Sequence, residues 1–236
     1  MNSIHFSPLI VIPVYNAEKA IQNVCLDLSQ NLEKKLDIIF IDNRSTDKTV
    51  ELLKNFKKYD PTLNFRIIQN QRNLGLGGSQ KRAFDLGHQG GYSHLIIFHG
   101  DGQPSAKDLV QLLSLLSKTT CEAILGSRFI RGSVRNNYSM IRTLGNRVFN
   151  LIFSLRCKTR VYDIGSGMNA YSLDIIRHLD DLPDDLSFNS FLLVRQIRDK
   201  EKIAWMPISW KNSEAGSSLK MFSIGVKCLS ALFKIK

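Results

Sequence analysis

The sequence predicts a single α/β domain built on a mostly parallel sheet with helices on both faces. Short β-branched or aromatic apolar runs alternate with segments of helical apolar spacing through the first half of the chain. The 236 residues are 43% hydrophobic, which is enough for one sizeable core. No linker rich in Pro, Gly or Ser divides the chain. These observations favour one continuous domain over two small ones.

The first half supplies most of the predicted sheet. Strands are predicted at residues 8–14, 37–41, 64–69, 94–98 and 122–125. Helices are predicted at 17–34, 47–59, 78–87 and 106–118, with Asn16, Thr46 and Ser105 as N-caps and Gly87 as a stop. Such alternation is typical of parallel strands joined by crossover helices. Ligands bind these sheets beyond the carboxyl ends of the strands, where functional residues are therefore expected.

The second half is less regular. It is predicted to contain a helix at 139–155, a loop at 163–167, a strand at 168–172, a helix at 187–199 and a strand at 202–208. We divide the chain into a main domain, residues 1–218, and a C-terminal amphipathic basic helix, residues 219–236. Lys220, Lys227 and Lys234 are seven residues apart and form a narrow cationic edge on that helix. The helix either closes over the sheet or lies in a bilayer interface.

The positive charge of the chain is concentrated in its second half. Residues 1–120 hold 14 basic and 11 acidic side chains, whereas residues 121–236 hold 18 and 10. Within residues 126–160 there is no acidic side chain, and the basic ones are Arg128, Arg131, Arg135, Arg142, Arg147, Arg156, Lys158 and Arg160. Such a segment suits nucleic acid, an anionic membrane surface or a phosphorylated small molecule.

Other classes of protein are excluded by simple features. No apolar run reaches the roughly 18 residues of a membrane-spanning helix. The N-terminal apolar run is short, lacks a preceding basic residue and contains Pro13, so no secretory signal is recognised and a cytoplasmic location is expected. The four cysteines are far apart and form no Cys-x-x-Cys pair, so we expect reduced, mostly buried thiols.

Polar clusters follow four successive predicted strands, at residues 13–16, 42–47, 73–78 and 99–103. Gly75, Gly77 and Gly78 in the third cluster invite comparison with a dinucleotide-binding fingerprint. The third glycine of that fingerprint would fall at Gln80, and the cluster does not follow the first strand. A Rossmann dehydrogenase is therefore rejected, and no Walker A loop is present.

The fourth cluster suggests a metal site. His99, Asp101 and Gln103 alternate after a strand, so in an extended backbone their side chains would share one face. Carboxylate and amide oxygens favour Mg²⁺ or Mn²⁺, and an imidazole shifts the preference towards Mn²⁺. The neighbouring glycines allow a ligand to approach the backbone closely.

The ordered set of motifs resembles a known family. It comprises Val-Ile-Pro-Val-Tyr-Asn (11–16), Ile-Asp-Asn-Arg-Ser-Thr-Asp-Lys-Thr (41–49), Asn-Leu-Gly-Leu-Gly (73–77), Gly-Asp-Gly-Gln (100–103), Gly-Ser-Arg (126–128) and Asp-Ile-Gly-Ser-Gly (163–167). Across residues 8–215 the chain resembles the family 2 glycosyltransferases of the Rossmann-like GT-A fold, and within them the dolichyl-phosphate mannosyltransferase type. The resemblance implies inverting transfer of a sugar from a nucleotide diphosphate donor.

The resemblance also implies roles for individual residues. Pro13, Tyr15 and Asp42 match positions that frame the nucleotide, Asp101 matches the second carboxylate of the Asp-x-Asp metal motif, and Gln103 matches the glutamine after it. Arg128 and Arg142 match two arginines that meet a lipid-phosphate acceptor. The predicted donor-binding set is Pro13, Tyr15, Asn16, Asp42, Gly75 and Asp101; the catalytic set is Asp101, Arg128, Arg142 and Asp163; the metal set is Asp101, His99 and Gln103.

Three departures from the family pattern are present. His99 stands where the first metal-motif aspartate is usual, which removes one negative charge. Asn43-Arg44 replaces the common Asp-Gly after Asp42, and Ser213 occupies the place of a late arginine before Gly216. These differences indicate a distinct branch of the family.

Three functions follow from these features. The first is synthesis of a polyprenyl-phosphate sugar at the inner face of the cytoplasmic membrane, where the acceptor phosphate attacks without a general base. The second is transfer to a hydroxyl of a lipopolysaccharide or capsule precursor, which needs a carboxylate base such as Asp163. The third, a nucleic-acid-binding domain, is disfavoured because the basic segment lacks interleaved exposed aromatic residues.

Overall fold

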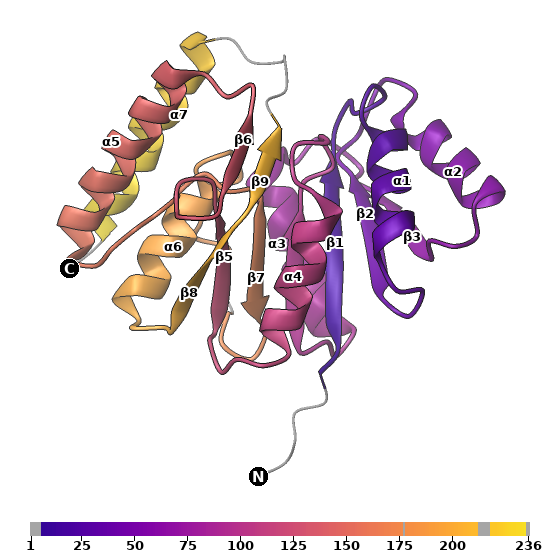
Figure 1. The fold of residues 1–236 in the computed structure, drawn as a ribbon, viewed down its shortest axis with the longest axis horizontal. Coiled ribbons are helices and arrows are strands. Elements are labelled where there is room, and N and C mark those ends of the chain that lie inside the picture. The colour runs from indigo at the N-terminus through magenta and orange to yellow at the C-terminus, as the bar shows by residue number, and fades with distance from the viewer. Residues whose placement is uncertain (1–5, 177, 212–217, 235–236) are drawn as a thin grey trace.

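The computed structural model describes residues 6–176, 178–211 and 218–234 (Figure 1). Its strands are β1 (Pro8–Val14), β2 (Asp37–Asp42), β3 (Phe65–Gln69), β4 (His94–Phe98), β5 (Ala123–Ser127), β6 (Val134–Asn136), β7 (Met168–Ser172), β8 (Ile203–Pro207) and β9 (Ser209–Lys211). Its helices are α1 (Ile21–Asn31), α2 (Thr49–Tyr59), α3 (Gly75–Gln89), α4 (Ala106–Leu116), α5 (Met140–Cys157), α6 (Phe188–Arg198), α7 (Ser218–Ser230) and the 3₁₀ helix η1 (Ala231–Lys234).

The main sheet is mostly parallel, as the alternating pattern predicts. Its strand order is β3-β2-β1-β4-β7-β5-β8, and β6 pairs with β9 in a separate two-stranded sheet. Strand β7 lies antiparallel between β4 and β5, while the other pairs of neighbours in the main sheet are parallel. The carboxyl ends of β1, β2, β3, β4 and β5 therefore meet at one edge, the upper edge in Figure 1.

The core has two layers, one on each face of the sheet. Successive residues of β1 alternate between them: Leu9 and Val11 face one layer, and Ile10 and Ile12 face the other. Helices α3, α5, α6 and α7 contribute to the first layer, and α1, α2 and α4 to the second. Figure 1 shows α4 in front of the sheet and α3 behind it. The predicted arrangement of helices on both faces is confirmed.

Some predicted helix ends are wrong. Ser105 does cap α4, because its Oγ accepts the Lys107 N–H. Asn16 and Thr46 cap nothing: the N-caps of α1 and α2 are Ala20 and Lys48. Asn16 instead accepts the Thr46 N–H at 2.9 Å, so its side chain links two loops. Helix α3 runs past Gly87, which is buried because the side chain of Leu173 packs against it.

Helix α7 and the turn η1 correspond to most of the predicted C-terminal helix. Cys228, Ala231 and Leu232 are buried in the first core layer, and Lys227 donates to Asp185 at 2.7 Å. The side chains of Lys220 and Lys234 lie outside the described set. A membrane role for residues 219–236 thus stays a prediction. Ile224 and Leu229 also pack against the core, whereas Val226 and Phe233 are exposed. None of the described helices is both long and apolar enough to cross a bilayer.

Candidate active site

Hydrogen bonds tie together the loops that follow the first three strands. The Asn43 N–H donates to the Val14 carbonyl and the Asn70 N–H donates to the Asp42 carbonyl, each at 2.8 Å. These bonds extend the pairing of β1, β2 and β3 by one residue beyond the strands. Asn16, in the left-handed region with φ 48°, adds its N–H bond to Ser45 Oγ. The three polar clusters predicted at these strand ends therefore form one connected surface.

Asp42 and Asn43 organise this surface from within. Asp42 is fully buried, and its carboxylate accepts from the Ser45 N–H and from Gln69 Nε2. Asn43 donates to Asn73 Oδ1 and accepts from the Leu74 N–H, both at 2.8 Å. The sequence marked Asn43 only as a departure from the family pair, so its role in holding the loop before α3 was missed.

Arg44 adopts a conformation that explains the usual glycine at its position. Its φ is 67°, in the left-handed region that glycine enters without steric cost. Arg44 holds this conformation at a strain of about 1 kcal/mol or more. A glycine at this position would carry no such strain.

The glycine-rich cluster serves packing. Gly75 has φ 74°, and a Cβ there would collide with the Asp184 carbonyl. A Cβ at Gly77 would lie 2.8 Å from the Cβ of Phe188 in α6. These glycines let the first turn of α3 lie directly against residues 183–188. Close approach of a ligand is not what requires them, although Gly75 stays a predicted donor-binding residue.

A cavity of about 200 Å³ opens at the carboxyl ends of β1 and β4. It is lined by Pro13, Val14, Tyr15, Ala17, Leu76, His99, Gly100, Asp101 and Leu186. Four predicted site residues thus meet there: Pro13, Tyr15, His99 and Asp101. Asn16, Asp42 and Gly75 are not among the lining residues, and Asp42 supports the edge from beneath. Leu76 and Leu186, which sequence reasoning missed, close the cavity from the side of α3 and α6.

The predicted convergence of His99, Asp101 and Gln103 on one strand face is wrong. Strand β4 ends at Phe98, and a turn follows in which Gly102 has φ 74°. The Asp101 carboxylate accepts the Gln103 N–H within this turn, and Gln103 Nε2 donates to the Lys211 carbonyl of β9. Gln103 is therefore anchored to a different element, whereas His99 and Asp101 line the same cavity.

His99, which lines this cavity, has an unsatisfied nitrogen. Its Nε2 is buried and makes no hydrogen bond within the described residues. Burial lowers the pKa of the His99 imidazole; the Asp101 carboxylate opposes this effect and the Arg128 guanidinium adds to it. The ring lies flat over Gly167, where a Cβ would be 2.7 Å from His99 Cγ. A neutral imidazole held in this way is in the form that binds a metal ion.

Arg128 and Asp163 form a buried, bidentate ion pair. Nε and Nη2 of Arg128 each lie 2.8 Å from a different oxygen of Asp163. The same carboxylate accepts the backbone N–H groups of Arg128 and Gly165. Asp163 is only 3% exposed, and its two oxygens accept from four donors in all. This arrangement orders the 163–167 loop beside β5 and does not suit a general base.

Aromatic rings surround the Arg128 guanidinium. Its Cζ lies 5.3 Å from the Trp210 ring centroid and 5.8 Å from that of Tyr138. Burial alone would lower the pKa of Arg128, but the Asp163 carboxylate more than compensates, and the pKa is raised. Arg128 is therefore permanently charged while most of its surface is enclosed.

Arg142 lies on the first turn of α5, close in the chain to the Arg128 environment. Asn146 Nδ2 donates to the Arg142 carbonyl and to the Tyr138 hydroxyl, and that hydroxyl lies 3.4 Å from Arg128 Nη1. This network connects the start of α5 to the buried ion pair. The predicted contact of Arg128 and Arg142 with an acceptor stays a prediction.

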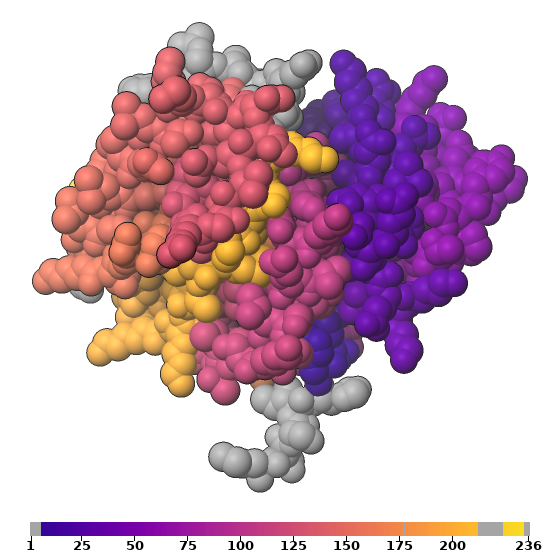
Figure 2. Space-filling model, viewed as in Figure 1, coloured from indigo at the N-terminus to yellow at the C-terminus, as the bar shows by residue number. Residues whose placement is uncertain are grey.

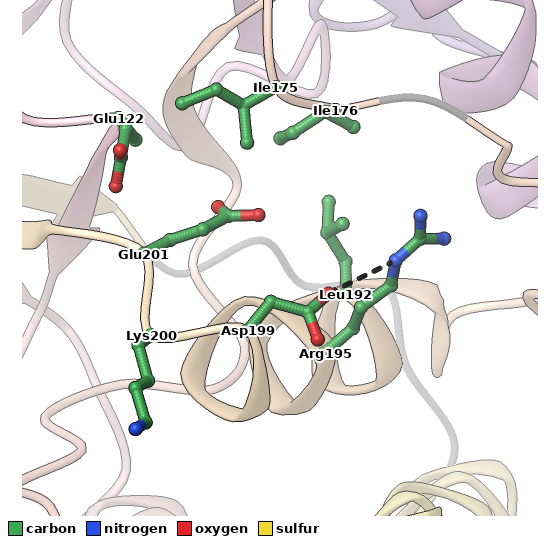
Figure 3. A pocket seen from close by; sticks show the side chains of 8 residues that line it. All are labelled: Glu122, Ile175, Ile176, Leu192, Arg195, Asp199, Lys200 and Glu201. Carbon is green, nitrogen blue, oxygen red and sulfur yellow. Dashed lines mark ion pairs between the residues drawn. The ribbon is translucent and has the colours of Figure 1, made fainter.

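A second cavity, of about 310 Å³, lies at the opposite edge of the sheet (Figure 3). Glu122 and Glu201 stand just before β5 and β8, and Ile175 and Ile176 follow the antiparallel β7. Burial raises the pKa of Glu201, and Glu122 adds to this effect. None of the predicted site residues lines this cavity.

A family model described as glycosyl transferase family 2 matches residues 9–180, which include the strand-end clusters and the 163–167 loop. The chain belongs to this family. A family 2 glycosyltransferase is an enzyme that transfers sugars, so the cavity at the carboxyl edge is the candidate active site.

Curated relatives of this glycosyltransferase align with it over most of their length. Polyprenol monophosphomannose synthase of Mycolicibacterium smegmatis is 24% identical over 96% of this chain and 84% of the relative. Undecaprenyl-phosphate mannosyltransferase of Micrococcus luteus is 25% identical over 89% of this chain and 86% of the relative.

Solved structures share the fold of this glycosyltransferase. Glucosyl-3-phosphoglycerate synthase from Mycobacterium tuberculosis, in complex with Mn²⁺, UDP-glucose and glycerol 3-phosphate, superposes with a TM-score of 0.72 over 98% of this chain. It covers 80% of that chain at 18% identity. The mostly parallel sheet of GT-A type is therefore confirmed.

Proposed function

We propose that this enzyme transfers a sugar, with inversion, from a nucleotide diphosphate donor to a polyprenyl phosphate at the cytoplasmic face of a membrane. One observation carries the acceptor class. Asp101 is the only acidic residue among the described residues that line the cavity. The carboxylate of Asp163 already accepts hydrogen bonds from four donors. An acceptor hydroxyl needs a free base, whereas a phosphate is already an anion. The relatives named for polyprenol and undecaprenyl phosphate support the same class.

The donor would occupy the cavity at the ends of β1 and β4. Tyr15 is half exposed there and offers a ring face, and Pro13 forms the adjacent wall. Asn16, Asp42 and Gly75 would complete the nucleotide-binding surface from the connected loops. The neighbour from Mycobacterium tuberculosis holds UDP-glucose, which supports a nucleotide sugar as the donor.

A divalent cation would be held by His99 and Asp101 together with diphosphate oxygens of the donor. The buried, unpartnered Nε2 of His99 fits such a role, as does the Asp101 carboxylate in the same cavity. Gln103 does not line this cavity, and the bond from its Nε2 to the Lys211 carbonyl holds its side chain towards β9. When bound, the ion neutralises charge that develops on the leaving diphosphate. Imidazole among oxygen ligands favours Mn²⁺ over Mg²⁺.

The acceptor phosphate would be oriented by the arginine-rich side of the edge. Arg142 would contact the phosphate directly. Asp163 holds Arg128 through Nε and Nη2, so the Nη1 side of the guanidinium would add positive charge near the phosphate. A phosphate oxygen then attacks the anomeric carbon from the face opposite the leaving diphosphate, which inverts the configuration. Charge-assisted contacts of this kind contribute about 1.5–3 kcal/mol each.

The test is a transfer assay with a panel of sugar nucleotides, Mn²⁺ and a water-soluble short-chain prenyl phosphate. Arg142→Ala should lower kcat/KM about ten- to a hundred-fold. Arg147→Ala, on the same helix, is the matched control and should change it less than about threefold. Wild-type transfer to a saccharide hydroxyl, with no transfer to any prenyl phosphate, would refute the proposal and favour the lipopolysaccharide or capsule precursor.

A further inference from the structure

Helix α5 carries a row of large apolar side chains that the domain does not cover. The row, here called the α5 stripe, consists of Met140, Ile141, Leu144, Val148, Leu151 and Leu155. Their exposed fractions lie between 46% and 87%. At about 100° of rotation per residue, all six fall within an arc of about 100° on the helix. They form one continuous surface along its length.

The opposite side of α5 holds the helix on the domain. Phe153 is fully buried, and Asn150 Nδ2 donates to the Tyr162 carbonyl at 2.6 Å. Phe149 packs against α7 at Gly225. Figure 2 shows α5, in salmon, as the outer layer of this side of the molecule, in front of α7. The stripe is therefore the outward face of a firmly docked helix.

Basic side chains border the stripe. By the same helical rotation, Arg147 lies just beyond one margin and Arg156 beyond the other. The whole segment 126–160 carries eight basic and no acidic residues. An apolar face edged by arginines is the pattern of a helix that lies in the interface of an anionic bilayer. A second copy of this chain would instead bring like charges together across a self-complementary contact.

We infer that the α5 stripe inserts into the headgroup boundary of an anionic membrane and is the main docking element of this enzyme. The inference rests on the proposed function, because it supplies the place where a lipid acceptor is met. Helix α5 begins at the same upper edge of the sheet as β6 and β9 (Figure 1), so docking brings that edge to the bilayer. Arg142, on its first turn, lies outside the stripe on the side of the helix that carries the buried Phe153, so it faces the site and not the lipid.

The experiment is vesicle co-sedimentation of the full chain. Wild type should bind phosphatidylglycerol vesicles and bind phosphatidylcholine vesicles more weakly. Leu144→Ser with Leu151→Ser should lower the partition coefficient at least tenfold, because two exposed apolar side chains lose their burial in the membrane. Leu26→Ser with Leu115→Ser, on α1 and α4, is the matched control, since both leucines are also exposed. It should leave vesicle binding unchanged.

Two further measurements make the outcomes decisive. The melting temperatures of both double variants should match wild type, and their transfer to the short-chain acceptor should be unaffected. Unchanged vesicle binding by the variant with Leu144→Ser and Leu151→Ser would overturn the inference. A wild type that is a dimer in solution and does not bind vesicles would overturn it as well. Wild type that binds vesicles through the stripe but transfers sugar to no prenyl phosphate would refute the proposed function alone.

Discussion

Arg128 and Asp163 show how a predicted catalytic pair acquires a structural role. The two residues lie 35 positions apart, and the fold closes them into a buried ion pair with Trp210 alongside. Removal of one partner from such a pair leaves a buried charge without compensation. Substitution of Arg128 or of Asp163 would therefore impair folding and activity together. An activity assay alone could not distinguish this loss from the loss of a catalytic group.

A double-mutant cycle separates the two effects. Arg128→Met and Asp163→Leu should each lower the free energy of unfolding by about 3–5 kcal/mol, because each strands the other charge. The double variant should lose less than the sum, with a coupling of about 1–3 kcal/mol. Urea denaturation at neutral pH measures all four proteins. Strict additivity would show that the pair contributes nothing specific to the stability of this edge.

His99 gives the second residue-scale prediction. The variant His99→Asp restores the carboxylate usual at this position and removes the imidazole. Because a hard carboxylate favours Mg²⁺ relative to imidazole, the ratio of transfer rates with Mn²⁺ and Mg²⁺ should fall at least about threefold. The ratio cancels any general loss of activity caused by the smaller side chain. An unchanged ratio would mean that His99 only packs against Gly167.

At the scale of elements, helix α5 joins the site to the outer surface. Its first turns belong to the Tyr138–Asn146 network, its inner face packs on α7, and its outer face is the α5 stripe. Two glycines report on these contacts separately. A Cβ at Gly145 would meet no atom within 4 Å, whereas one at Gly225 would lie 2.8 Å from the Phe149 ring.

Alanine substitutions at these glycines should have opposite effects. Gly145→Ala should raise the free energy of unfolding by about 0.5–1 kcal/mol, because alanine favours a helix interior more than glycine does. Gly225→Ala should lower it by about 1–3 kcal/mol, because the methyl group overpacks the α5–α7 contact. Thermal unfolding of the two variants measures both effects. Equal stabilisation by the two would show that α7 does not pack on α5 at this point.

At the scale of the molecule, the two edges of the sheet differ in charge and in use. The carboxyl edge carries the candidate active site and the first part of the arginine-rich segment, whereas Glu122 and Glu201 gather at the other edge. Glu201 is half-buried and accepts from Gln196 Nε2 at 2.8 Å. Because burial raises its pKa, the folded protein holds this proton to a higher pH than the unfolded chain does. Folding stability therefore falls as pH rises through that interval, and the cost persists above it.

Replacement of this carboxyl group should remove the cost. Glu201→Gln keeps an oxygen for Gln196 and should raise the melting temperature at pH 7 by at most about 2–4 °C. The gain should shrink as pH falls towards the ordinary glutamate pKa of about 4.3 and disappear below it, where Glu201 is protonated in both states. Glu33→Gln, at an exposed position, is the control and should shift the melting temperature by less than about 1 °C. A gain that is independent of pH would contradict the explanation.

Local pattern determined much of this protein. The predicted strands, the loop at 163–167 and the helix from 139 to 155 follow from periodicity and turn residues, which neighbouring residues impose on one another. The strand-end clusters were found for the same reason, because parallel strands place their carboxyl ends at one edge. Pro13, Tyr15, His99 and Asp101 accordingly meet in one cavity.

Tertiary structure decided what depends on contacts between distant segments. Sequence could not show that β7 separates β4 from β5, that Gln103 turns to Lys211, or that Asn43 holds the loop before α3. The sequence offered Asp163 as a catalytic residue and a base, and only the fold showed four donors around it. Likewise, the apolar residues of α5 are compatible with a buried helix. Their exposure depends on which side packs against Tyr162 and α7, and that choice is set by the whole fold.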